Sequence, residues 1–132
     1  MKLSVVVVAY DMARELPRTV RSLSPAMQRD IAAEDYELIV VDNGSPQPLD
    51  ADLLAQWGGH VRLHRIDDAP PSPVRAINEG LALARGELVA VCIDGARMAS
   101  PRLLATALEA ARLHPRPVIG TLAFHLGPDV QS

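Results

Sequence analysis

The stretch YELIVVDNGSP, residues 36–46, is an apolar, β-branched run that ends abruptly in polar turn formers. Its first part, Tyr36 to Val41, is typical of a short strand buried on both faces, and the cluster from Asp42 onward predicts a polar loop. The same pattern recurs in LSVVVVAYD at residues 3–11 and in ELVAVCID at residues 87–94. Such strands are characteristic of a parallel sheet, in which polar loops gather at the edge where the strands end.

Helical segments are expected between these strands. The first has apolar residues at helical spacing and begins around Arg14, and the second runs from a cap at Ser72 to a stop at Gly86. A third begins with Ser100 as its cap, and residues 50–57 form a short amphipathic piece. The spacing therefore predicts a helix or helical turn after each of the three central strands.

Two further strands complete the pattern. Residues 61–66 alternate like a less buried strand, and residues 117–124 form another strand-like run. Strands that alternate with helices predict right-handed crossovers and the α/β class, here a mostly parallel sheet flanked by helices. Residues 1–132 are expected to form a single domain, because a chain of this length has room for one ordinary core.

Composition excludes several classes of function. The formal net charge is −3, with acidic and basic residues interspersed, so no basic face indicates nucleic-acid binding. The single cysteine, Cys92, lies in an apolar run, which argues against disulfides and zinc and favours a reducing cytoplasm. No apolar stretch approaches the ~20 residues that span a bilayer. We expect a cytoplasmic protein without a transmembrane segment, and peripheral attachment to a membrane is left open.

Candidate site residues follow the expected strands. Glycine-rich dinucleotide and P-loop fingerprints are absent, so a bound nucleotide must be held in another way. Tyr10 offers a ring that can stack on a base, and Asp42 can accept hydrogen bonds from an imide or a ribose. Arg75 offers a planar fork of donors for a base or a phosphate, and Asp94 ends the strand at residues 87–94. Together these groups suit a nucleoside.

Three segments in this order, LSVVVVAYD, YELIVVDNGS and RAINEGLALARGELVAVCIDGARMASPRLL, resemble the nucleotide-sugar-binding half of a family 2 glycosyltransferase with the GT-A fold. The order and spacing of Val-Val-Asp-x-Gly-Ser, Asn-x-Gly and a strand ending in aspartate carry the resemblance. It implies a Rossmann-like half that binds a nucleotide-sugar donor for inverting transfer. The nucleotide-sugar-binding residues that it implies are Ala9, Tyr10, Asp42, Gly44, Arg75, Asp94 and Arg97.

The sequence departs from the family at the metal motif. Members of the family usually have an Asp-x-Asp motif, in which the second carboxylate binds a divalent cation. This chain has Asp94-Gly-Ala96-Arg97 instead. Mg²⁺ or Mn²⁺ prefers several oxygen ligands, and Asp94 alone supplies few. We hypothesise that Arg97 partly replaces the cation by stabilising charge on the departing diphosphate.

The acceptor side of the reaction is not recognisable. The resemblance implies that the chain lacks the acceptor-binding C-terminal half, so no catalytic base is assigned and the chain alone can be inactive. The acceptor can be a saccharide, a lipid or a protein. A missing half would also leave apolar surface exposed, which favours association into a homo-oligomer.

Simpler roles for the same residues stay open. Asp42 and Asp94 can cap turns, Tyr10 can pack beneath its loop, and Asn43 and Ser45 can shape the turn after residues 36–42. The alternative function is a non-catalytic nucleotide-binding or scaffold module with a degenerate metal motif.

Overall fold

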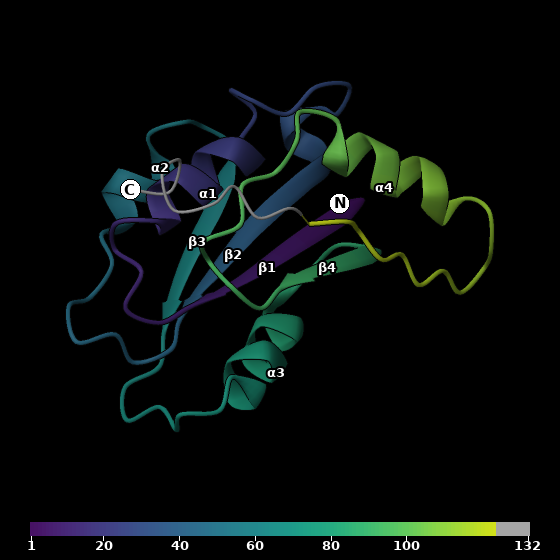
Figure 1. Ribbon diagram of the computed structural model, residues 1–132. Helices are drawn as coiled ribbons and strands as arrows, with labels where there is room; N and C mark the ends of the chain where they lie inside the picture. Colours follow the sequence, from purple (N-terminus) through teal and green to yellow (C-terminus); the bar gives the residue numbers. More distant parts are fainter. Residues whose placement is uncertain (124–132) are drawn as a thin grey trace.

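The computed structural model describes residues 1–123, which form a four-stranded parallel sheet with helices on both faces (Figure 1). The strands lie in the order β3-β2-β1-β4. Every neighbouring pair is parallel, with Leu3 opposite both Tyr36 and Leu88. The strands are β1 (Leu3–Ala9), β2 (Tyr36–Asp42), β3 (His60–Arg65) and β4 (Leu88–Cys92).

The helices cover the two faces unequally (Figure 1). Even-numbered residues of β1, such as Val6 and Val8, join Ala76 of α3 in one core cluster. Odd-numbered residues, such as Val5 and Val7, join the core beneath α1, α2 and α4. The helical elements are α1 (Leu16–Leu23), the short 3₁₀ turn η1 (Ala33–Asp35), α2 (Ala51–Ala55), α3 (Val74–Leu83) and α4 (Leu103–Ala111). Within residues 1–123, each helix is too short or too polar to span a bilayer.

The predicted α/β class, with a parallel sheet between helices, is confirmed. All residues of β1 and β2 are buried, as expected for strands covered on both faces. The strand expected at residues 117–124 is wrong over its described part, because residues 117–123 form no strand and Phe124 lies outside the described residues. Val118 is 99% exposed and Leu122 is 88% exposed, and no strand described within residues 1–123 pairs with this run.

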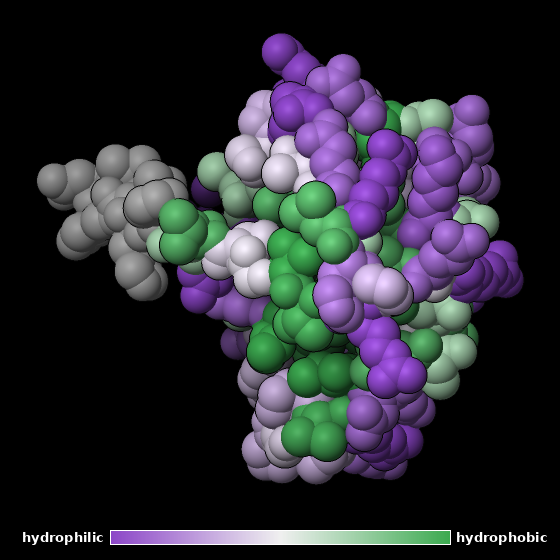
Figure 2. Space-filling model, turned by 90° about the vertical axis from the view of Figure 1, so that its right-hand side faces the viewer, coloured by the Kyte–Doolittle hydropathy of each residue, from purple (hydrophilic) through white to green (hydrophobic). Residues whose placement is uncertain are grey.

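β4 forms one edge of the sheet and leaves apolar side chains in contact with solvent. Val91 in the strand is 41% exposed, and Ile93 directly after it is 63% exposed. Figure 2 shows a band of hydrophobic residues across the middle of the face that lies to the right in Figure 1. This edge therefore combines apolar side chains with backbone groups that no strand among residues 1–123 pairs.

The buried carboxylate of Glu37 in β2 connects β1, β3 and the segment between α3 and β4. Glu37 in β2 is 2% exposed and accepts hydrogen bonds from Ser4 Oγ at 2.8 Å and from the Arg85 backbone N–H at 2.9 Å. Arg62 Nη2 of β3 donates to both carboxylate oxygens, at 3.1 and 3.2 Å, and to the Leu83 carbonyl. Burial alone raises the pKa of Glu37. The hydrogen bonds and the Arg62 charge together lower it by more than burial raises it, so the net pKa lies below its usual value.

Gly86 lies against β1 and does not cap α3 as expected. The helix ends at Leu83, and Ala84 is its C-cap. The Gly86 backbone N–H donates to Ser4 Oγ at 2.8 Å. A Cβ on Gly86 would lie 2.5 Å from the carbonyl carbon of Leu3 and closer still to the Ser4 backbone nitrogen. A hydrogen atom at this position therefore allows the turn before β4 to approach the backbone of β1.

We predict that Glu37→Gln lowers the free energy of unfolding by roughly 2 kcal/mol at pH 7, because it leaves Arg62 without its charged partner. Arg62 keeps partial access to water, which holds the cost below that of a fully buried pair. Since the folded-state pKa of Glu37 is lowered, its stabilisation is complete above the unfolded value of about 4.3 and is lost as the pH falls through the folded value. Urea denaturation should show a difference between the two proteins that is constant from about pH 7 to pH 5 and shrinks below about pH 4. An undiminished difference at low pH would contradict this account.

We predict that Gly86→Ala destabilises the chain by more than about 2 kcal/mol, because the added methyl group meets backbone atoms that cannot move aside cheaply. Gly120→Ala is the matched control, since a Cβ there meets nothing within 4 Å. Its free energy of unfolding should stay within about 0.5 kcal/mol of the wild type in the same urea titration. Equal effects at both positions would show that the close approach at Gly86 is not required.

Candidate functional site

A pocket of about 480 Å³ lies at the carboxyl ends of β1, β2 and β4. This is the edge where ligands collect in open parallel sheets. Apolar and polar groups share its walls, as is usual for sites that bind small molecules. The lining residues are Val8, Tyr10, Met12, Asn43, Gly44, Ala69, Pro70, Pro71, Pro73, Ile93 and Asp94.

Tyr10 presents an available aromatic ring at this pocket. It directly follows β1 and is 56% exposed, so it does not pack beneath its loop. The next residue, Asp11, has a φ of 52° and donates its backbone N–H to Ser45 Oγ at 3.0 Å. Ser45 thus joins the loop after β1 to the loop after β2, and the joined loops hold Tyr10 at the pocket.

Asp42 has a structural role in the loop after β2. It is fully buried, and its two oxygens accept hydrogen bonds from the Ser45 N–H at 3.0 Å, the Leu49 N–H at 3.3 Å and Arg65 Nη1 at 2.9 Å. Burial alone raises the pKa of Asp42, but the bonds from Ser45, Leu49 and Arg65 lower it to a net value below the usual one. Asp42 does not line the pocket, so the turn-shaping role is the one that this geometry supports.

Asn43 is the polar group of this loop that lies at the pocket. It is 6% exposed, its Oδ1 is buried, and that oxygen accepts no hydrogen bond from residues 1–123. Its backbone N–H donates to the Ala9 carbonyl at 2.9 Å, so the buried Ala9 positions Asn43 and does not line the pocket itself. The sequence assigned Asn43 only to the turn. Its place directly after Asp42, at the end of a strand, was the sequence signal that could have placed Asn43 at the pocket.

Gly44 brings the loop after β2 against the segment before α3. Its φ is +75°, which favours glycine, and a Cβ there would lie 3.0 Å from the Cβ of Ala69. Ala69 begins a proline-rich wall of the pocket, formed with Pro70, Pro71 and Pro73. This wall was not anticipated from the sequence. It presents rigid, apolar rings that lack backbone N–H donors.

Asp94 and Arg97 lie on the loop after β4, where they contact each other. Asp94 Oδ1 accepts from the Ala96 N–H at 2.9 Å, and its Oδ2 lies 3.7 Å from Arg97 Nε. Asp94 lines the pocket. Arg97 does not line it, but it pairs with Asp94. Both side chains are about half exposed, at 43% and 50%. They are therefore free to exchange this weak pair for a ligand.

Residues of α1 and the following turn hold this loop in place. Thr19 Oγ1 donates to the Gly95 carbonyl at 2.5 Å, and the Ala99 N–H donates to Ser22 Oγ at 2.8 Å. Gln28 continues this connection, because its Nε2 donates to the Ser100 carbonyl and its Oε1 accepts from the Leu104 N–H. The loop that carries Asp94 is therefore fixed at several points.

Arg75 lies outside the pocket in this structure. Its Nε is 3.6 Å from Glu79 Oε2, one turn further along α3. Of the seven residues expected in the site, the structure brings Tyr10, Gly44 and Asp94 to the pocket. Ala9, Asp42, Arg75 and Arg97 do not line it.

The donor groups present do not fit a tightly held divalent cation. Residues 1–123 contain no cluster of three or more His, Cys, Asp or Glu side chains that could ligate a metal. Asp94 already accepts from the Ala96 N–H and faces Arg97, and Ala96 has no side-chain oxygen. Mg²⁺ and Mn²⁺ need several oxygen ligands, which this part of the chain does not supply.

Comparison with known proteins supports the expected resemblance. The sequence model described as glycosyl transferase family 2 matches residues 4–126. A curated relative, the uncharacterized protein y4gI of Sinorhizobium fredii, is 36% identical over 98 residues, which cover 70% of this chain and 10% of the relative. The chain thus spans a tenth of that relative's length.

Solved structures of TarS from S. aureus share the fold. The structure of TarS residues 1–349 superposes with a TM-score of 0.75 at 24% identity, over 86% of this chain and 33% of that one. Its complex with UDP gives the same TM-score, identity and coverage. Its complex with UDP-GlcNAc gives a TM-score of 0.72 at 24% identity, over 86% of this chain and 32% of that one. This likeness confirms the GT-A nucleotide-binding architecture.

We predict stability effects of different size for the two neighbouring polar residues Asp42 and Asn43 at the end of β2. Asp42→Asn should lower the free energy of unfolding by about 2 kcal/mol, because it removes the charged partner of Arg65 and replaces one of the two acceptor oxygens, which serve the Ser45 and Leu49 N–H groups separately, with an NH₂ group. Asn43→Ala should change it by less than about 0.5 kcal/mol, since Oδ1 makes no hydrogen bond with the described residues. Urea titrations at pH 7 measure both values. A large loss for Asn43→Ala would show that its side chain mainly holds the turn.

Proposed function

The chain is a member of glycosyl transferase family 2, and we propose that it is the donor-binding portion of a glycosyltransferase that uses a UDP-sugar. The observation that carries the proposal is the pocket at the strand ends, which combines an exposed ring at Tyr10 with the side chain of Asn43, whose buried Oδ1 accepts no hydrogen bond from residues 1–123. The TarS complexes with UDP and UDP-GlcNAc support the choice of a uridine nucleotide, because the same fold holds those ligands.

In this proposal, the base enters between the Tyr10 ring and the proline-rich wall at residues 69–73. Stacking of a base on an aromatic ring is worth roughly 1–3 kcal/mol in other nucleotide complexes. The Asn43 amide has both an acceptor and donors, which match the N–H and carbonyl groups on the imide edge of uracil. A buried polar group without a partner is costly, so a turn of the Asn43 side chain that brings Oδ1 to the base would gain affinity.

Asp94 is proposed to hold the ribose. It lies at the pocket on a fixed loop and is 43% exposed, so its carboxylate can accept from a ribose hydroxyl. Ala9 and Gly44 act through the backbone, by placing Asn43 and by allowing the loop after β2 to approach Ala69. Asp42 contributes by holding that loop, and its direct contact with the base stays a prediction.

The reaction proposed for the whole enzyme is inverting transfer. An acceptor hydroxyl attacks the anomeric carbon of the donor, the bond from that carbon to the diphosphate oxygen breaks, and a base removes the hydroxyl proton. Saccharide, lipid and protein acceptors are all compatible with this chemistry. We assign no base among residues 1–123, and the chain spans only a third of the TarS structure that it resembles.

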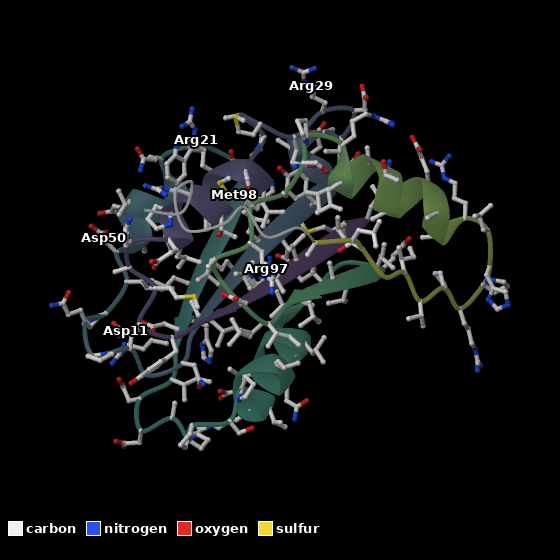
Figure 3. The ribbon with its side chains drawn as sticks, viewed as in Figure 1. Asp11, Arg21, Arg29, Asp50, Arg97 and Met98 are labelled. Carbon is white, nitrogen blue, oxygen red and sulfur yellow. The ribbon has the colours of Figure 1, made fainter. Side chains whose placement is uncertain are left out.

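Thermal unfolding with and without UDP tests the proposed site. UDP at a hundredfold excess over its dissociation constant should stabilise the chain by about 2.7 kcal/mol, which raises Tm by roughly 10 °C. Tyr10→Ala and Asn43→Ala should remove most of this rise without unfolding the chain. Arg29→Gln is the control, because Arg29 projects from the outer edge of the molecule, away from the strand ends (Figure 3).

The outcome of this test separates the candidate functions. A Tm that no concentration of UDP changes would contradict the proposed site. A rise that survives both site substitutions would show that UDP binds elsewhere. UDP binding without any hydrolysis of UDP-GlcNAc, in this chain or in a longer natural form, would instead favour the nucleotide-binding module.

A further inference from the structure

We propose that Arg97 supplies the positive charge that faces the donor's diphosphate, so that nucleotide binding at this site does not require a divalent cation. This inference rests on the proposed function, because it concerns the same pocket. It adds the means by which the pocket compensates the negative charge of its ligand.

The first step in the argument is the lack of a metal site. A cation at the pocket would find one side-chain carboxylate, Asp94, whose Oδ1 accepts from the Ala96 N–H. Its other oxygen faces Arg97 Nε at 3.7 Å, so a cation there would lie beside a like charge. Ala96 supplies no second oxygen ligand. Residues 1–123 hold no cluster of three or more His, Cys, Asp or Glu side chains that could ligate a metal.

The second step is that the charge of a diphosphate still needs a partner. Most arginines with ion pairs near the sheet already have a structural function. Arg62 is bound to Glu37, and Arg65 is bound to Asp42 and Asp67. Arg75 makes a similarly long pair of 3.6 Å, but with Glu79, which does not line the pocket. Arg97 makes one weak pair with Asp94 and is 50% exposed. Its guanidinium can therefore turn to an anion with little loss.

The third step is the position of Arg97. Figure 3 shows its side chain in the middle of the view, over the sheet, whereas Arg21 and Arg29 project from the outer edge. Thr19 and Ser22 hold the loop on both sides of Arg97, through the Gly95 carbonyl and the Ala99 N–H. The backbone that carries Arg97 is thus fixed before a ligand arrives, which lowers the entropic cost of binding.

The fourth step is chemical fit. A guanidinium presents a planar fork of N–H donors that can bind two phosphate oxygens at once. Asp94 then has a double function, because it holds Arg97 at the pocket rim in the free protein and is released for the ribose when the diphosphate takes its place. The Asp94–Arg97 pair replaces the carboxylate pair that the family uses for a metal.

Calorimetric titration of the wild-type chain tests this inference with UDP as the probe. The dissociation constant should agree within about twofold between buffer with EDTA and buffer with Mn²⁺ or Mg²⁺. Arg97→Gln should weaken UDP binding by about tenfold or more, and Arg97→Lys should recover part of the loss. Arg29→Gln, the matched control, should bind UDP as the wild type does, and uridine should bind Arg97→Gln and wild type equally.

Each result distinguishes this inference from the proposed function. UDP binding that appears only with a divalent cation would overturn the role of Arg97 and leave the proposed function intact. Unchanged UDP affinity in a folded Arg97→Gln variant, checked by circular dichroism, would do the same. The absence of UDP binding under every condition would overturn both proposals.

Discussion

Two buried carboxylates hold β2 in the sheet, and each is paired with an arginine of β3. Glu37 pairs with Arg62 near the beginning of the strand, and Asp42 pairs with Arg65 at its end. A buried charge without a partner is very costly, so each pair fixes how β2 and β3 lie against each other. The same two carboxylates also accept backbone N–H groups from neighbouring segments. The loops at both ends of the sheet therefore take their shape from charges inside β2.

This arrangement divides the polar residues of the chain into two groups. Asp42 and Arg65 are engaged with the protein itself and have little capacity left for a ligand. Tyr10, Asn43 and Asp94 line the pocket, and within residues 1–123 the Asn43 Oδ1 accepts no hydrogen bond and Asp94 makes only a weak pair with Arg97. A nucleotide can then bind without removing interactions on which the fold depends. The sequence places members of both groups side by side, at Asp42 and Asn43.

The fold was predictable because its signals are local. Runs such as Val5 to Val8 specify buried strands by their composition alone, and the polar residues that follow mark the pocket edge. A turn-capping role for Asp42 was open from the sequence, but its ion pair was not predictable, because the partner Arg65 lies 23 positions further along the chain. Gly86 was misread for the same reason, since its partner Ser4 is 82 positions away. The run at residues 117–123 has strand composition but pairs with no strand of the described part of the chain.

The central position of β1 has a consequence for the order of folding. β1 precedes both of its neighbours in the sheet, β2 and β4, along the chain, and β4 begins only at Leu88. One side of β1 therefore stays unpaired until β4 has been synthesised. Parallel pairing between distant segments is slow to form, because the entropic cost of closing a long loop comes before any stabilising contact is made. Until then, β1 exposes apolar side chains and an unpaired strand edge, which are the features that make folding intermediates prone to aggregation.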